Sequence, residues 1–113
     1  MPAPLQGIRV LDLSRILAGP WASQTLGDLG AEIIKVERPE IGDDTRGWGP
    51  PFLHDGEPHA MSAYFLSANR GKKSVTIEFG KPEGQELIRR LAAASDILIE
   101  NYKFRGLKKF GLV

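Results

Sequence analysis

The first 37 residues constrain the fold more than any other part of the sequence. Residues 7–13 read GIRVLDL, a short and nearly continuous apolar run that is typical of a strand covered on both faces in a parallel sheet. Residues 31–37, AEIIKVE, predict a second strand of the same kind. Gly19 and Pro20 can open a helix between them, because a proline in the first helical turn removes no hydrogen bond. Strand, helix and strand within about 30 residues predict a βαβ unit.

Three apolar residues predict which side of this first helix is buried. Ala22, Leu26 and Leu29 are spaced four and three residues apart, so they share one face of a helix over residues 21–29. Gly30 follows and is a plausible left-handed stop for the helix.

The second half of the chain repeats the order of strand, helix and strand. Residues 74–79 and residues 97–100 predict strands, and Pro82 begins a helix between them. The fold class is therefore α/β, a Rossmann-like and mostly parallel sheet with flanking helices. Two good helices leave such a sheet incomplete on its own, so we expect a larger domain or a second chain to complete it. The predicted buried stripe of the second helix comprises Leu87, Ile88, Leu91 and Ala92.

Residues 38–62 predict a long loop, because prolines, glycines and acids interrupt every periodic pattern there. Trp48 and Phe52 favour an ordered loop, since free linkers seldom carry large aromatic side chains.

Composition excludes several classes of function. Lys plus Arg number 15 and Asp plus Glu number 14, a net charge of +1 that gives no case for a nucleic acid or a membrane surface as partner. The absence of cysteine excludes disulfides, a thiol nucleophile and thiolate metal sites. Neither a secretory signal nor an apolar run of about 20 residues is visible, and we expect a cytoplasmic protein.

Three kinds of catalytic or cofactor site find weak support. Glu37 ends the second predicted strand, where a ribose contact would lie, but the first turn lacks the glycines of G-x-G-x-x-G. The segment HDGEPH matches none of the usual zinc spacings, so a solvated loop is favoured over a metal site at His54 and His59. Asp43 and Asp44 are interpreted as turn formers or partners of Arg46. No serine lies in G-x-S-x-G, which argues against a serine hydrolase.

The sequence gives more support to a binding site for an anionic ligand than to these three kinds of site. Arg38 follows the second predicted strand, and a basic cluster over residues 103–109 follows the last one. Parallel strands end at one edge of a sheet, where ligands bind in open α/β folds. Arginine and lysine at that edge could hold phosphates, with Asn101 and Tyr102 between them. A solvated basic helix end is the equally simple alternative.

Two long strings of the sequence carry a resemblance to known proteins: GIRVLDLSRILAGPWASQTLGDLGAEIIKVERPEIGDDTRGWGPPF and SAYFLSANRGKKSVTIEFGKPEGQELIRRLAAASDILIENY. Both resemble CoA-transferase family III, the group of formyl-CoA transferase and carnitine CoA-transferase. The resemblance covers about residues 5–112. It implies that residues 1–113 form the amino-terminal part of a large Rossmann-like CoA-binding domain, without the family's small domain. It also implies an interlocked homodimer of the complete protein.

The resemblance further implies an activity. Family members move CoA from an acyl-CoA donor to a carboxylic acid through an aspartyl intermediate, without a metal. Coenzyme A contacts are implied for Ile16, Leu17, Ala18, Arg38, Ile77, Asn101, Tyr102, Lys109 and Phe110. No catalytic residue is implied within this chain, because none of its aspartates matches the family's nucleophile, which lies beyond position 113.

Departures from the family leave alternatives open. Leu17 replaces the glutamine of formyl-CoA transferase, which argues against a formyl or oxalate preference. The segment KFRGLKKFG lacks the proline and glycine that usually follow the Asn–aromatic pair, so the turn there is expected to differ. An acyl-CoA racemase of the same fold, or a non-catalytic module for CoA binding or subunit association, are the alternative functions.

Overall fold

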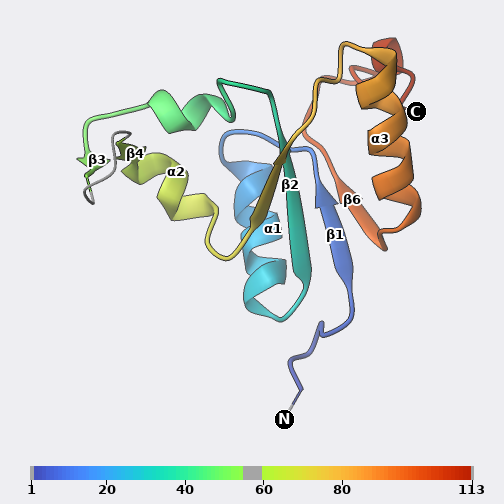
Figure 1. Cartoon of the computed structure of the whole chain (residues 1–113). Helices are drawn as coiled ribbons and strands as arrows, with labels where there is room; N and C mark the ends of the chain where they lie inside the picture. The colour runs from blue at the N-terminus through green and yellow to red at the C-terminus, as the bar shows by residue number, and fades with distance from the viewer. Residues whose placement is uncertain (1, 55–59, 113) are drawn as a thin grey trace.

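A four-stranded parallel sheet forms the centre of the computed structural model, which describes residues 2–54 and 60–112 (Figure 1). The strands are ordered β5-β2-β1-β6, and every neighbouring pair is parallel. The prediction of an α/β fold with a mostly parallel sheet is confirmed. The strands are β1 (Arg9–Asp12), β2 (Glu32–Glu37), β5 (Lys73–Thr76) and β6 (Ile97–Ile99).

The strand order contains a switch point between β1 and β6, where successive strands begin to be added on the other side of β1. The chain passes from β1 outward to β2 and β5, and then returns to pair β6 with the other side of β1. This is the order of the first four strands in a Rossmann fold, whose ligands bind at the carboxyl ends of the strands beside such a switch. The segments that follow β1 and β6 therefore meet at the edge where a site is expected.

Two helices cover opposite faces of the sheet. Helix α3 (Pro82–Ala93) packs on one face, with Ile88 against a core that includes Leu11, Leu13 and Val36. Helix α1 (Ala18–Asp28) lies on the other face, where Leu26 packs against Val10 and Ile33. Because side chains alternate along a strand, adjacent residues of β1 supply different cores. Leu87 was wrongly predicted to be buried, since 45% of it is exposed on α3.

The buried side of α1 agrees with the predicted one only at Leu26. Ala22 and Leu29 are exposed, whereas Ser23 and Gln24 are buried. The Gln24 amide donates to the carbonyl of Ser67 at 3.0 Å and accepts from the Arg70 N–H at 2.6 Å, so burial does not leave it unpaired. Apolar spacing failed here because hydrogen bonds, rather than apolar contacts, attach this face of the helix. The helix begins at Ala18, and Gly30 follows it with φ of 109°, as expected of a left-handed stop.

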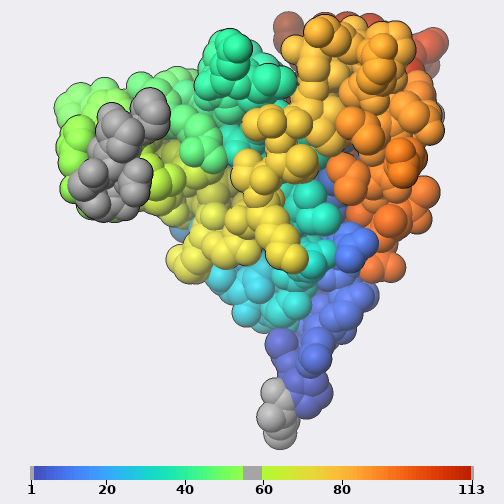
Figure 2. Space-filling view, viewed as in Figure 1, coloured from blue at the N-terminus to red at the C-terminus, as the bar shows by residue number. Residues whose placement is uncertain are grey.

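The predicted long loop and the residues directly after it contain short elements that form a lobe beside the sheet (Figure 2). Trp48 and Tyr64 meet edge to face at 5.3 Å, which agrees with the order expected from Trp48. The Ser62 hydroxyl accepts from the N–H of Tyr64 at 3.1 Å and caps a third helix that the sequence did not predict. The elements are η1 (Asp44–Gly47), β3 (Phe52–Leu53), β4 (Met61–Ser62) and α2 (Ala63–Ala68).

Beyond β6 the chain forms a short 3-10 helix, η2 (Lys108–Phe110), which packs near α3. Leu107 is buried in the core under α3, and Phe110 packs against that core. Within residues 2–54 and 60–112, no helix is both long enough and apolar enough to cross a bilayer.

Candidate functional site

A pocket of about 440 Å³ lies at the carboxyl edge of the sheet. Segments that follow all four strands contribute to it, as expected for an open α/β fold. It is lined by Ser14, Arg15, Lys35, Val36, Glu37, Arg38, Gly42, Asp43, Glu78, Phe79, Gly80, Tyr102, Lys103, Gly106, Lys109 and Phe110.

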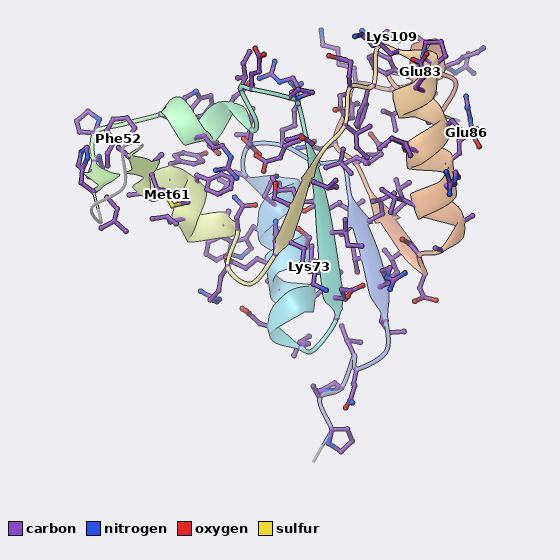
Figure 3. The ribbon with its side chains drawn as sticks, viewed as in Figure 1. Phe52, Met61, Lys73, Glu83, Glu86 and Lys109 are labelled. Carbon is purple, nitrogen blue, oxygen red and sulfur yellow. The ribbon has the colours of Figure 1, made fainter. Side chains whose placement is uncertain are left out.

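The pocket combines aromatic walls with a basic rim. Phe79 meets Phe110 edge to face at 5.9 Å and lies 6.2 Å from the ring of Tyr102. Besides the buried Lys35, four cationic side chains share the lining: Arg15, Arg38, Lys103 and Lys109. Aromatic faces suit a flat heterocycle, and guanidinium and ammonium groups suit phosphates. Figure 3 shows Lys109 at the end of the molecule where α3 begins, far from Phe52 and Met61 of the lobe.

The structure brings together four of the side chains that the sequence singled out. Arg38, Tyr102, Lys109 and Phe110 all line this pocket. Ile77 does not line it; only 6% of Ile77 is exposed, and it belongs to the core against which Tyr102 and Phe110 pack. Arg38 and the last segment, 64 or more positions apart in the sequence at the residues that line the pocket, therefore share one cavity.

Ile16 and Leu17 end the connection from β1 to α1, and Ala18 begins α1; these three residues lie outside the pocket lining. Ile16 has φ of 75°, a left-handed conformation that a β-branched residue adopts only under constraint. Its N–H faces the carboxylate of Asp43 at 3.3 and 3.4 Å. The neighbouring loop thus helps to fix this turn.

Asn101 fastens the end of β6 to the segment after β1. Its side-chain oxygen accepts from the N–H of Arg15 at 3.0 Å, and its amide nitrogen donates to the carbonyl of Arg15 at 2.7 Å. The Arg15 guanidinium lies 5.2 Å from the ring centre of Tyr102. Asn101 therefore acts at the switch in strand order by holding the Arg15 peptide.

A buried ion pair lies beneath the pocket and was missed by the sequence analysis. The Lys35 ammonium donates to Asp43 at 2.9 Å and to the carbonyl of Ser14 at 3.1 Å, and each charged side chain is 1% exposed. Burial tends to raise the pKa of Asp43, but hydrogen bonds from Thr45 and Lys35 outweigh burial and lower the pKa. This pair ties β2, the turn after β1 and the start of η1 to one another.

A second buried pair joins Asp12 of β1 to Lys72, with 3.1 Å between the charged atoms. The Ser14 and Ser23 hydroxyls donate to the Asp12 carboxylate. Lys72 also donates to the carbonyl of Pro20 and the side-chain oxygen of Asn69, both at 2.9 Å. Burial lowers the pKa of Lys72 although Asp12 opposes the shift. Polar residues inside apolar strands, Asp12 and Lys35, were the signal for these pairs.

Glu37 serves the loop rather than standing free for a ribose. Its oxygens accept from the Arg46 guanidinium at 2.7 and 2.8 Å, from the Ser74 hydroxyl and from the N–H of Asp43. Burial raises the pKa of Glu37, but hydrogen bonds from Arg46, Ser74 and Asp43 lower it to about 2. Of the two roles predicted for Asp43 and Asp44, turn formation is confirmed for Asp43, whose side chain accepts from the N–H of Thr45 at 3.0 Å, whereas the ion-pair partner of Arg46 is Glu37.

No metal site emerges in the part of the chain that the structure describes. Among those residues, no group of three or more histidine, cysteine or acidic side chains is placed to hold an ion. His54 is exposed, whereas Asp55, Glu57 and His59 of the sequence candidate lie outside the described residues.

Comparison with known proteins gives one consistent family. A family model described as CoA-transferase family III matches residues 5–113. The chain is 54% identical over 110 residues to a succinate–glutarate CoA-transferase from Agrobacterium fabrum, covering 96% of the chain and 28% of that protein. It is 52% identical over 109 residues to human succinyl-CoA:glutarate CoA-transferase, covering 96% of the chain and 24% of that protein.

Solved structures of similar proteins share the fold of this chain. A CAIB/BAIF family protein from Brucella suis superposes with a TM-score of 0.92 at 57% identity, covering 100% of the chain and 29% of that structure. Rv3272 from Mycobacterium tuberculosis gives a TM-score of 0.87 at 41% identity, covering 99% of the chain and 30% of that structure. The chain thus spans about a quarter of the length of the curated relatives it matches.

Proposed function

Because the chain belongs to CoA-transferase family III, we propose that its pocket binds coenzyme A as part of an acyl-CoA:carboxylate CoA-transferase. Residues 1–113 would form the amino-terminal part of that enzyme's large Rossmann-like domain. The observation that carries the proposal is the convergence of Arg38, Tyr102, Lys109 and Phe110 on one cavity at the strand ends.

The lining suits the nucleotide end of CoA. Arg38 and Lys109 would hold phosphates by charge-assisted hydrogen bonds. Phe110 and Phe79 would pack against the adenine, with Ile77 supporting the wall from within the core.

Tyr102 would flank the pantetheine arm of CoA, which would then run toward the segment of Ile16, Leu17 and Ala18. Asn101 would fix that path through its two hydrogen bonds to Arg15.

This part of the enzyme would bind and orient its substrate, and would not supply the nucleophile. Three carboxylates line the pocket, and each already accepts hydrogen bonds. Glu37 and Asp43 accept ion-pair and backbone hydrogen bonds, and Glu78 accepts from the N–H of Gly80 at 2.9 Å. Elsewhere in the complete enzyme, an aspartate carboxylate would attack the thioester carbonyl and expel CoA thiolate, forming a mixed anhydride. The thiolate would then attack the aspartyl carbonyl and release the first acid, before the second acid takes the CoA. An interlocked homodimer belongs to the same proposal.

We further propose a small dicarboxylic acid as the CoA acceptor. Relatives between 42% and 54% identical to the chain carry the names of succinate, glutarate and mesaconate transferases. A relative from Chloroflexus aurantiacus at 43% identity is named for succinyl-CoA and L-malate. Transfer from succinyl-CoA to glutarate by the native protein is the corresponding assay, with acetate as the monocarboxylate comparison.

Calorimetry with CoA tests the pocket. Arg38→Ala in the native protein is expected to weaken CoA binding by at least about tenfold, since a hydrogen bond to a charged group contributes roughly 1.5–3 kcal/mol. Arg70→Ala is the matched control, because Arg70 forms an exposed ion pair with Asp28 and does not line the pocket. Equal CoA affinity in Arg38→Ala and the native protein would contradict the assignment.

A further inference from the structure

Two arginines from different strand ends share one carboxylate at the mouth of the pocket. Arg38, just after β2, donates to one oxygen of Asp44. The guanidinium of Arg15, which follows β1, lies 3.8 Å from the other oxygen. Both arginines line the pocket, whereas Asp44 is not among its lining residues. The geometry therefore directs two guanidinium groups at a single anion beside the cavity.

Contacts near the backbone restrict both arginine side chains. The peptide of Arg15 is fixed by the two hydrogen bonds from Asn101, and its guanidinium lies over the Tyr102 ring at 5.2 Å. The Nε of Arg38 donates to the carbonyl of Gly42 at 3.4 Å. Anchored guanidiniums lose less freedom when they take up a ligand, so they are preorganised for an anion.

The contacts of Asp44 are weak enough to exchange. The side chain of Asp44 is 32% exposed, and those of Arg15 and Arg38 are 42% and 48% exposed. Exposed ion pairs contribute little free energy, because water screens the charges. Arginine forms bidentate hydrogen bonds with carboxylates and phosphates alike, but a phosphate carries more charge, so the phosphates of CoA would compete with a single carboxylate. Asp43, the residue before Asp44, does not form such an exposed contact, because its ion pair with Lys35 is almost fully buried.

We propose that Asp44 is an exchangeable counter-ion, which holds Arg15 and Arg38 at the mouth of the pocket and yields them to a phosphate of CoA. The proposal rests on CoA being the ligand and adds Arg15 to the phosphate-binding side chains. It assigns adjacent aspartates to different tasks: Asp43 fixes the loop permanently, and Asp44 competes with the ligand. Asp44 thereby lowers the affinity of the pocket for CoA.

The test is calorimetric titration of the native protein and its Asp44→Asn variant with CoA. Removing the competing charge is expected to tighten CoA binding by about two- to fivefold, the range that an exposed ion pair can supply. Asp28→Asn is the matched control, because Asp28 is an exposed carboxylate paired with Arg70 away from the pocket. Its CoA affinity is expected to equal that of the native protein. Asp44→Ser serves as the second variant if Asp44→Asn does not fold.

The arginines provide a second, independent readout. Arg15→Ala is expected to weaken CoA binding by about tenfold. If Asp44 acts through these side chains, its substitution will tighten binding less in an Arg15→Ala, Arg38→Ala background than in the native protein. Unchanged or weaker CoA binding by Asp44→Asn would overturn the counter-ion proposal while leaving CoA binding intact. Failure of the native protein to bind CoA would overturn both proposals.

Discussion

The two faces of the sheet are built from different chemistry. The apolar face, beneath α3, is the core cluster of Leu11, Leu13, Val36, Ile77, Ile88 and Leu107. The ionic face, on the side of α1 and η1, has a smaller apolar cluster around Val10 and Ile33 and also carries Asp12, Lys35 and Glu37 with their ion-pair partners. Neighbouring residues of one strand thus serve opposite purposes, as Lys35 and Val36 of β2 show.

The difference separates holding the fold together from placing the site. Apolar burial stabilises in proportion to area and specifies few individual contacts. Buried ion pairs add little net stability over apolar residues of the same shape, but a broken pair is costly and its geometry is specific. The pairs here attach the turn after β1 and the start of η1, the two segments that bring Arg15 and Asp44 to the pocket.

Removing the charge of Lys35 is expected to have the largest effect on the stability contributed by the ionic face. Lys35→Met keeps the length of the side chain and leaves Asp43 buried without its cation. The free energy of unfolding of the native protein is expected to fall by roughly 3–5 kcal/mol. Urea unfolding measures it, and adding Asp43→Asn to the variant should restore part of the loss. A loss below about 1 kcal/mol would show that the ionic face is not tightly coupled.

Acid should weaken the ionic face selectively. The pKa of Glu37 is lowered from 4.5 to about 2, so its ionised form stabilises the fold above about pH 4.5, and this contribution is lost as the pH falls toward 2. Glu37→Gln is therefore expected to be less stable than the native protein at pH 7 by on the order of 2–3 kcal/mol. Urea unfolding across pH 2–6 should show this gap shrinking with acid. A gap independent of pH would contradict the role given to the Glu37 charge.

The smallest expected effect comes from trimming the apolar face. Ile88→Val removes one methylene group from the core under α3 and should cost roughly 0.5–1.5 kcal/mol of unfolding free energy. CoA affinity, measured by calorimetry, should stay at the native value, because Ile88 does not line the pocket. A marked loss of CoA affinity would show that both faces position the site.

The same division explains what the sequence could predict. Apolar periodicity in the sequence reports residues that pack on the apolar face. It predicted the parallel strands, and it predicted that Ile88, Leu91 and Ala92 of α3 lie at the core. It mispredicted α1, because Ser23 and Gln24 are buried through hydrogen bonds that no hydrophobic pattern records. The pairing of Lys35 with Asp43 depends on where a loop returns, which local sequence does not specify.

The pocket residues were predictable for a topological reason. Arg38 and Lys109 each follow a strand, and parallel strands end together, so their shared edge could be inferred before any coordinates. Arg15 and Asp44 were not singled out as ligand contacts. Their convergence depends on Asn101 and on the buried Lys35–Asp43 pair, which are tertiary contacts.

A crystal structure of the native protein with CoA tests the central claim most directly. We predict phosphate oxygens within hydrogen-bonding distance of Arg38 and Lys109, the adenine against Phe110, and Arg38 separated from Asp44. CoA bound elsewhere on the protein, with the Arg38–Asp44 contact intact and the pocket at the strand ends unused, would contradict the account.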